Sequence, residues 1–423
     1  MKIPNLRLLI LTGLSRVISA LGGLVFTIAV GRIFGAEVLG QFVFANSIVL
    51  LLVMAAKFGG DRDLIKFNAI HWEASWSALR LARLRRACLI SACISMIAIT
   101  VLWIVAALID EPRTSMLVVL APAVFFMSWM WLNAGFLKGM SYPHIGTLFE
   151  NGIVSAVAAI ILFFCALGAI STETTLTASY VTAGLLVWTI SLVAVLFVNH
   201  RVSDDIAVGQ AKAVHVERSG LAFAMIDMTN FLISSGSFIV GAFVLTSHEI
   251  GLLRGAERAS VLIVFILSVT NVIVAPRIAR SFASANHDQL VSAGQWAVRW
   301  NVILASPVVV ICMVYPSIFV EMFGPEFSGI EPFIRIMGAG HLINVVSGPC
   351  AMLLAMTDYA ALAVRINIIS LAISMALYII FSTLYGPTGF AVAYAVSIVV
   401  RNGLMLVAVK TKLRLWYLPR FGF

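Results

Sequence analysis

Two arginines and one glutamate lie close together in an otherwise apolar stretch of the sequence. Arg254 and Arg258 are four residues apart, so a helix places both on one face, and Glu257 beside them can pair with either. A guanidinium pair suits a diphosphate, because each planar group can donate two parallel hydrogen bonds. These residues are therefore candidates for binding an anionic group. The alternative is that the three residues only neutralise one another at the start of a helix and bind no ligand.

Two more ionisable residues, Arg16 and Asp227, each lie about two helical turns into an apolar run. A charge inside a membrane span costs several kcal/mol unless it faces protein or water, which makes both residues functional candidates. Arg16 could instead extend its side chain to the cytoplasmic interface. Asp227 could instead be a structural partner of a Ser, Thr or Asn on a neighbouring helix.

Further ionisable residues are secondary candidates, because all but one of them lie near the predicted end of a span, where a side chain reaches water easily. His341 is the one placed inside a span: it could carry a proton, or it could be a hydrogen-bonded packing residue. The set is Glu150, Arg299, His341 and Arg365, with Arg401 as a still weaker member.

The composition is that of a membrane protein. Hydrophobic residues make up 61% of the 423 residues and charged residues only 11%, and the mean hydropathy is +1.04. Apolar runs of bilayer-spanning length recur without the period-two alternation of barrel strands, so we expect an all-α polytopic protein. The five cysteines lie within or at the ends of these runs, and we expect no disulfides.

The apolar runs predict about twelve transmembrane helices. Residues 58–86 are expected to lie outside the spans, with an amphipathic interfacial piece around His71–Arg86, and residues 200–218 to form a polar linker. The predicted spans are 9–33, 37–57, 87–109, 114–137, 145–170, 176–199, 219–245, 250–275, 294–322, 331–356, 361–384 and 388–409.

The distribution of Lys and Arg predicts the orientation of these spans. With twelve spans, 19 of the 28 basic residues fall on the side of the two termini, 4 on the other side and 5 within spans. The excess of basic residues in cytoplasmic loops then places both termini in the cytoplasm.

A weak internal repeat predicts two six-helix lobes, 1–199 and 219–423, joined by 200–218. Aligning Gly40 with Gly251, at an offset of 211, places Arg16 on Asp227. Parallel repeats of this kind occur in transporters, and they would set Arg16 and Asp227 on opposite sides of a central cavity. The alternative is chance similarity between apolar helices that have a glycine at one end.

Several signatures of enzymes are missing from the sequence. No GxxxxGK[ST] phosphate loop, GxSxG elbow, CxxC motif or close His pair occurs, so we expect no ATPase site, metal or other cofactor. The predicted outer loops are too short to build the site of a membrane polymerase or ligase. A transporter is therefore favoured over an enzyme.

Motifs along the whole chain resemble those of one known family. Residues 30–40 (VGRIFGAEVLG) resemble the opening of the Wzx-type polysaccharide flippases, which belong to the multidrug/oligosaccharidyl-lipid/polysaccharide (MOP) exporter superfamily. Residues 251–258 (GLLRGAER) and the later stretch from Asn271 to Ala279 are similar to the same family. So are Ser347-Gly348-Pro349 and residues 385–389 (YGPTG).

The resemblance implies two six-helix lobes around a central cavity with alternating access. It also implies flipping of an oligosaccharide on an undecaprenyl diphosphate carrier, from the cytoplasmic to the periplasmic leaflet. Arg16, Arg254 and Arg258 would then contact the diphosphate or acidic sugars, and Asp227 would balance the cavity's charge or take a coupling proton. The partners expected are the lipid-linked oligosaccharide and membrane lipids, with H⁺ or Na⁺ as the candidate coupling ion, no nucleic acid and a monomeric chain. The polymer, O-antigen or exopolysaccharide, is left open.

Two other functions compete with this hypothesis. A multidrug and toxin exporter of the same superfamily would bind organic cations in an acidic and aromatic cavity, whereas the charges predicted within spans here lean cationic. A membrane glycosyltransferase or polymerase would need a catalytic constellation, and none is evident.

Overall fold

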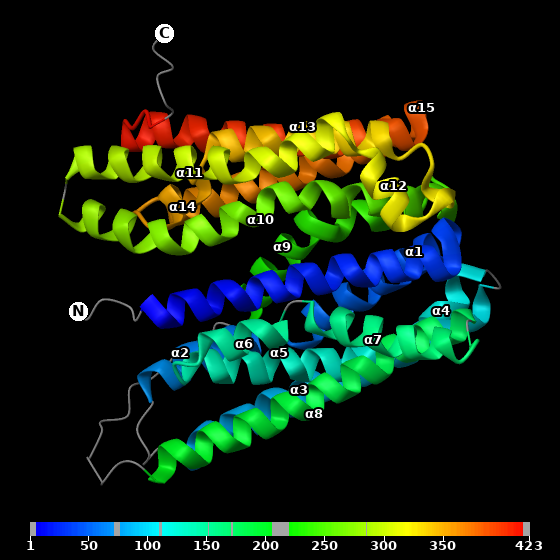
Figure 1. Cartoon of the computed structure of the whole chain (residues 1–423). Coiled ribbons are helices and arrows are strands. Elements are labelled where there is room, and N and C mark those ends of the chain that lie inside the picture. The colour runs from blue at the N-terminus through cyan, green and yellow to red at the C-terminus, as the bar shows by residue number, and fades with distance from the viewer. Residues whose placement is uncertain are drawn as a thin grey trace. The chain divides into compact units, whose positions relative to one another are not determined.

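The computed structural model describes residues 6–71, 77–109, 112–150, 152–170, 172–204, 220–284 and 286–417, and within these ranges every regular element is helical (Figure 1). The α-helices are α1 (Leu6–Ala56), α2 (Gly60–Ile70), α3 (Ser77–Leu108), α4 (Pro112–Leu120), α5 (Ala123–Gly139), α6 (Pro143–Glu150), α7 (Ile153–Leu167), α8 (Glu173–Asp204), α9 (Gly220–Gly241), α10 (Ser247–Ala283), α11 (His287–Val314), α12 (Ser317–Phe323), α13 (Glu331–Ser347), α14 (Cys350–Ala355) and α15 (Ala360–Ala408). A short 3₁₀ turn (Pro325–Phe327) and a π turn (Val409–Leu413) complete them. The chain is therefore an all-α polytopic membrane protein, as the sequence predicts.

The two longest helices, α1 and α15, each contain two predicted spans divided by a glycine. Gly35 has φ 81° and ψ 179°, and Gly386 has φ 59° and ψ −141°, so neither continues the helix. Such positive φ angles are readily adopted only by glycine. The breaks fall between the predicted spans 9–33 and 37–57, and between 361–384 and 388–409.

Length and apolar composition mark several helices as membrane-spanning. Five qualify within the described ranges, and up to seven if the bent pairs α4–α5 and α6–α7 each count as one span. Large apolar side chains such as Ile97, Val193 and Ile369 are more than half exposed. In water this surface would be unfavourable, but lipid chains solvate it.

Two sequence predictions about helix positions are wrong. The short amphipathic helix of this region is α2, Gly60–Ile70, because residues 77–86 instead belong to the N-terminal part of α3. The predicted span 294–322 begins earlier, at His287, and ends at Val314. Pro316 explains the early end: it lacks the N–H that a continuing helix would need.

The chain divides into two compact units. The first comprises Met1–Phe34 and Gln41–Leu232, and the second Gly35–Gly40 and Ile233–Phe423. In the first unit α5 packs against α2, α3, α6 and α8, and in the second α10 packs against α11 and α13. The predicted linker 200–218 begins with the last turn of α8, and its residues 205–218 lie outside the described part of the chain.

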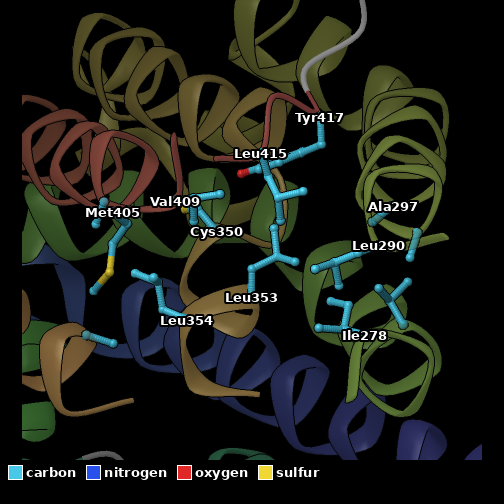
Figure 2. Packing of buried hydrophobic residues seen from close by; sticks show 14 of the residues in the cluster. Ile278, Leu290, Ala297, Cys350, Leu353, Leu354, Met405, Val409, Leu415 and Tyr417 are labelled. Carbon is cyan, nitrogen blue, oxygen red and sulfur yellow. The ribbon is translucent and has the colours of Figure 1, made fainter. Parts of the chain in front are cut away.

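The second unit has an apolar core at the ends of α10, α11 and α15 (Figure 2). Leu353 and Leu354 of α14 are fully buried in it, and Leu415 and Tyr417 after the π turn are also buried. The Tyr417 hydroxyl donates a hydrogen bond to the Ser347 carbonyl at 2.7 Å. Burial raises the pKa of this phenol well above its usual range, so the hydroxyl stays a donor.

A very close backbone contact joins the start of α10 to the turn inside α1, both in the second unit. A methyl group on Gly251 would overlap the Ala36 carbonyl, and one on Gly40 would overlap the Ser247 carbonyl. Beside this contact the Ala36 N–H donates to the Glu326 carboxylate at 3.1 Å. Glycine at both positions therefore allows the backbones of α1 and α10 to come this close together.

Candidate functional site

A buried ionic cluster lies in the first unit and consists of Lys57, Asp61, Arg62 and Asp227; we call it the Lys57 cluster. The Lys57 ammonium pairs with Asp61 at 2.7 Å and with one oxygen of Asp227. The other Asp227 oxygen accepts from Arg62, with its Nε at 2.8 Å and a terminal nitrogen at 2.5 Å. Three of the members therefore come from the segment that ends α1 and begins α2, and the fourth from α9.

Burial makes the pairing within this cluster energetically important. The side chain of Lys57 is 1% exposed, that of Asp61 5% and that of Asp227 8%, whereas Arg62 remains 39% exposed. The Lys57 ammonium also lies 4.8 Å from the centre of the Trp131 ring. Two cations and two carboxylates balance, so the cluster is neutral as a whole.

Glu150, a secondary sequence candidate, has its own partner in the first unit. Its carboxylate pairs with the Lys138 ammonium at the end of α5, and both side chains are largely buried. The neighbouring charges that act on Glu150 include Asp61 and Lys57. Glu150 therefore belongs to the same charged region as the Lys57 cluster.

Arg80 is another charged residue buried in the first unit, and it is fully enclosed at the start of α3. Its guanidinium donates to the His71 carbonyl at 2.9 Å and to the Asn199 side chain at 3.3 and 3.4 Å. It thus connects the end of α2 with α3 and α8. The contacts are those of a structural anchor.

The three α10 residues proposed from the sequence, Arg254, Glu257 and Arg258, do interact; we call them the α10 triad. Glu257 is buried, and its Oε2 lies 3.2 Å from Arg254 and 3.8 Å from Arg258. Arg254 also lies 5.0 Å from the centre of the Phe238 ring. One carboxylate thus faces two guanidinium groups, whose side chains are 16% and 29% exposed.

His341 on α13 is buried in the second unit beside an aromatic side chain of α15. Its Nε2 lies 3.3 Å from the Tyr394 hydroxyl, and the two rings meet edge to face at 5.5 Å. The nearby charges that act on His341 are Glu257 and Arg401. His341 therefore shares its surroundings with the α10 triad.

The remaining candidate arginines, Arg16, Arg299 and Arg365, are exposed. Within the part of the chain that the structure describes, none of them forms an ion pair, and Asp227 pairs with Lys57 and Arg62 rather than with Arg16. Sequence reasoning had assigned Lys57, Arg62 and Arg80 to the cytoplasmic loops. One signal that could have found Lys57 is Asp61, four residues further on at the end of an apolar run.

Comparison with known proteins supports the fold independently. No family model matches the sequence, and a search of curated proteins finds no similar sequence. Among solved structures, an inward-facing multidrug resistance MATE family transporter of the MOP superfamily is similar with a TM-score of 0.71 and 14% identity, covering 95% of this chain and 98% of that one.

Two further structures give the same result. The lipid II flippase MurJ in an inward closed conformation matches with a TM-score of 0.68 and 13% identity, over 95% of this chain and 88% of that chain. A MOP superfamily transporter from Pyrococcus furiosus matches with a TM-score of 0.67 and 12% identity, over 97% and 95%. The chain thus has the multi-pass fold of MOP superfamily transporters, and identities this low bear on the fold alone.

Proposed function

We propose that this protein is a flippase that moves an undecaprenyl-diphosphate-linked oligosaccharide from the cytoplasmic to the periplasmic leaflet of a bacterial inner membrane, rather than an enzyme. The fold fits transport, because the similar structures include both a lipid flippase and drug transporters. The choice between an anionic lipid-linked substrate and a cationic drug depends on the charges of the candidate sites.

The observation that carries the proposal is the composition of the α10 triad. Two arginines share a single buried carboxylate, so the group keeps one net positive charge, and both guanidinium groups remain partly accessible. A diphosphate loses its hydration when it leaves water, and guanidinium donors can offset that loss. The Lys57 cluster, in contrast, is neutral and largely buried, which favours a structural or coupling role.

The rival function is export of organic cations. A cation exporter needs uncompensated carboxylates or aromatic faces, and Glu257 and Asp227 are each paired with two basic groups in the described structure. The pairing of both carboxylates therefore weighs against export of cations.

Deletion of the gene tests the proposal. We expect the surface polymer to disappear while an undecaprenyl-diphosphate-linked oligosaccharide accumulates on the cytoplasmic side, where extraction and mass spectrometry identify it. Unchanged lipid-linked sugars together with increased sensitivity to cationic drugs would instead establish the exporter.

A point variant tests the role of the α10 triad. Arg258→Gln leaves Glu257 with its closer partner, Arg254, so no buried carboxylate is stranded. Loss of one charge-assisted contact to the substrate should cost about 1.4 kcal/mol, which corresponds to about a tenfold change in affinity. At equal abundance in the membrane, the variant should therefore restore about tenfold less polymer to the deletion strain.

The matched control for this variant is Lys412→Gln, which removes one positive charge from an exposed side chain of the same unit. It is expected to restore polymer to the level of the unmodified protein. Full restoration by Arg258→Gln as well would show that the triad does not bind the substrate.

A further inference from the structure

A pocket of about 500 Å³ lies between α2 and α3, entirely within the first unit. This volume is within the range of small-molecule binding sites. Three basic side chains, Lys57, Arg83 and Arg86, line it, and Asp63 is its one acidic lining residue. Because Lys57 and Arg83 are paired with carboxylates, the positive charge that remains for a ligand is that of Arg86.

The first two of these cations are held in place. Lys57 is fixed by its two carboxylate partners in the Lys57 cluster. Arg83 donates two hydrogen bonds of 2.8 Å to the two oxygens of Asp63, and its guanidinium lies 4.4 Å from the centre of the Phe67 ring. Both cations are therefore compensated by carboxylates, and they shape the pocket rather than bind a further anion.

Arg86 differs from the other two cations. Its side chain is exposed, and among the residues that the structure describes it forms no ion pair. It lies on α3 three residues after Arg83, so the two side chains share one face of the helix. Arg86 is therefore available to a ligand without breaking an existing contact.

The rest of the α3 lining is apolar. Leu79 and Ile90 line the pocket, are 46% and 43% exposed, and lie on either side of the two arginines along the helix. Exposed apolar side chains continue along the same helix through Ile97 and Ile104. In a membrane this surface contacts lipid chains, so the basic lining residues adjoin a lipid-facing surface of the same helix.

We propose that this pocket binds the phosphate headgroup of a membrane lipid, with the lipid's hydrocarbon chain lying along Ile90 and the exposed apolar side chains that follow it on α3. Arg86 would donate hydrogen bonds to the phosphate, and the apolar surface explains why the ligand is a lipid rather than a free anion. The site is separate in sequence from the α10 triad, and the proposal does not depend on what the protein transports.

The test measures lipid binding by the purified full chain, delipidated in a neutral detergent, using native mass spectrometry. Phosphatidylglycerol is the probe, and phosphatidylcholine and diacylglycerol are the comparisons. We expect selective binding of phosphatidylglycerol that is about fivefold weaker in Arg86→Gln. Equal binding of all three lipids would overturn the proposal.

Arg85→Gln is a closely matched control. Arg85 is the neighbouring residue on α3, is also exposed and carries the same charge, but it does not line the pocket. Its affinity for phosphatidylglycerol is expected to equal that of the unmodified protein. A loss of affinity as large as that of Arg86→Gln would show general surface attraction and contradict a defined site.

Competition separates the possible sources of the phosphate. Displacement of phosphatidylglycerol by farnesyl diphosphate at about tenfold lower concentration would assign the pocket to a polyprenyl diphosphate carrier. Displacement only at higher concentration would assign it to bulk phospholipid. Both results support a site for a lipid phosphate. Displacement of phosphatidylglycerol by inorganic phosphate at equal concentration would instead show that the lipid's hydrocarbon chain contributes nothing to binding, and would overturn the proposal.

Discussion

At the scale of single residues, Asp227 is the member of the Lys57 cluster on which two basic side chains converge. Lys57 and Arg62 occupy different oxygens of its carboxylate. Because Lys57 is almost completely buried, its charge depends on Asp227 and Asp61 for compensation. Breaking a buried pair by removing one partner costs about 3–5 kcal/mol, since the remaining charge stays uncompensated.

We therefore predict that Asp227→Asn destabilises the protein by about 3 kcal/mol. The neutral amide leaves the buried Lys57 ammonium with Asp61 as its remaining carboxylate partner in the cluster. Unfolding of the purified protein in detergent, followed by circular dichroism, measures this loss.

Asp63→Asn provides the comparison, since Asp63 and Arg83 are 19% and 25% exposed. Their more solvated pair is expected to contribute about 1 kcal/mol or less. If the two asparagine variants lose equal stability, burial does not determine the strength of the Lys57 cluster.

The sequence could identify Asp227, Glu257 and Arg258 as unusual, because each is an ionisable residue in an apolar run. It could also predict the contact within the α10 triad, whose members are neighbours on one helix. The partners of Asp227 could not be predicted, because Lys57 lies 170 residues away and local spacing carries no information about that contact.

At the scale of elements, the crossing of α10 with the turn of α1 depends on paired glycines. Gly251→Ala would place a methyl group against the Ala36 carbonyl, and backbone atoms cannot move aside as a flexible side chain can. We predict a loss of about 2 kcal/mol or more, together with reduced amounts of protein in the membrane.

Gly403→Ala in α15 is the control for the glycine prediction, because no atom lies within 4 Å of the added methyl group. Alanine has the higher helix propensity, so this variant is expected to keep or slightly increase stability. Equal tolerance of both substitutions, measured by the same unfolding assay, would show that the close crossing is not needed.

Hydrophobic runs predict the long helices and two of their breaks, but not every helix boundary. The stops at Gly35 and Gly386 match the predicted gaps between spans, whereas the region around residues 71–86 was misplaced. Charged residues at 80–86 suggested an interfacial piece, yet Arg80 is buried by contacts from α2 and α8. Such tertiary contacts are not visible in a local window.

At the scale of the whole molecule, the positive-inside pattern predicts both termini in the cytoplasm. A green fluorescent protein fused after Lys412 should fluoresce, because it folds in the cytoplasm but not after export in unfolded form. Alkaline phosphatase inserted after Arg113, on the side predicted to be periplasmic, should be active.

As a control for orientation, the two reporters are exchanged between the two positions. Alkaline phosphatase after Lys412 should then be inactive. Activity there, with loss of fluorescence, would reverse the orientation. It would then place the pocket between α2 and α3 at the outer leaflet.

The long sequence separation within the Lys57 cluster has a consequence for synthesis. Asp227 is translated 170 residues after Lys57, so the ribosome delivers the ammonium to the membrane long before its distant partner exists. During that interval Asp61, four residues away, can neutralise it locally. The early helices can thus be inserted as they emerge, and α9 supplies the second carboxylate partner of Lys57 only later.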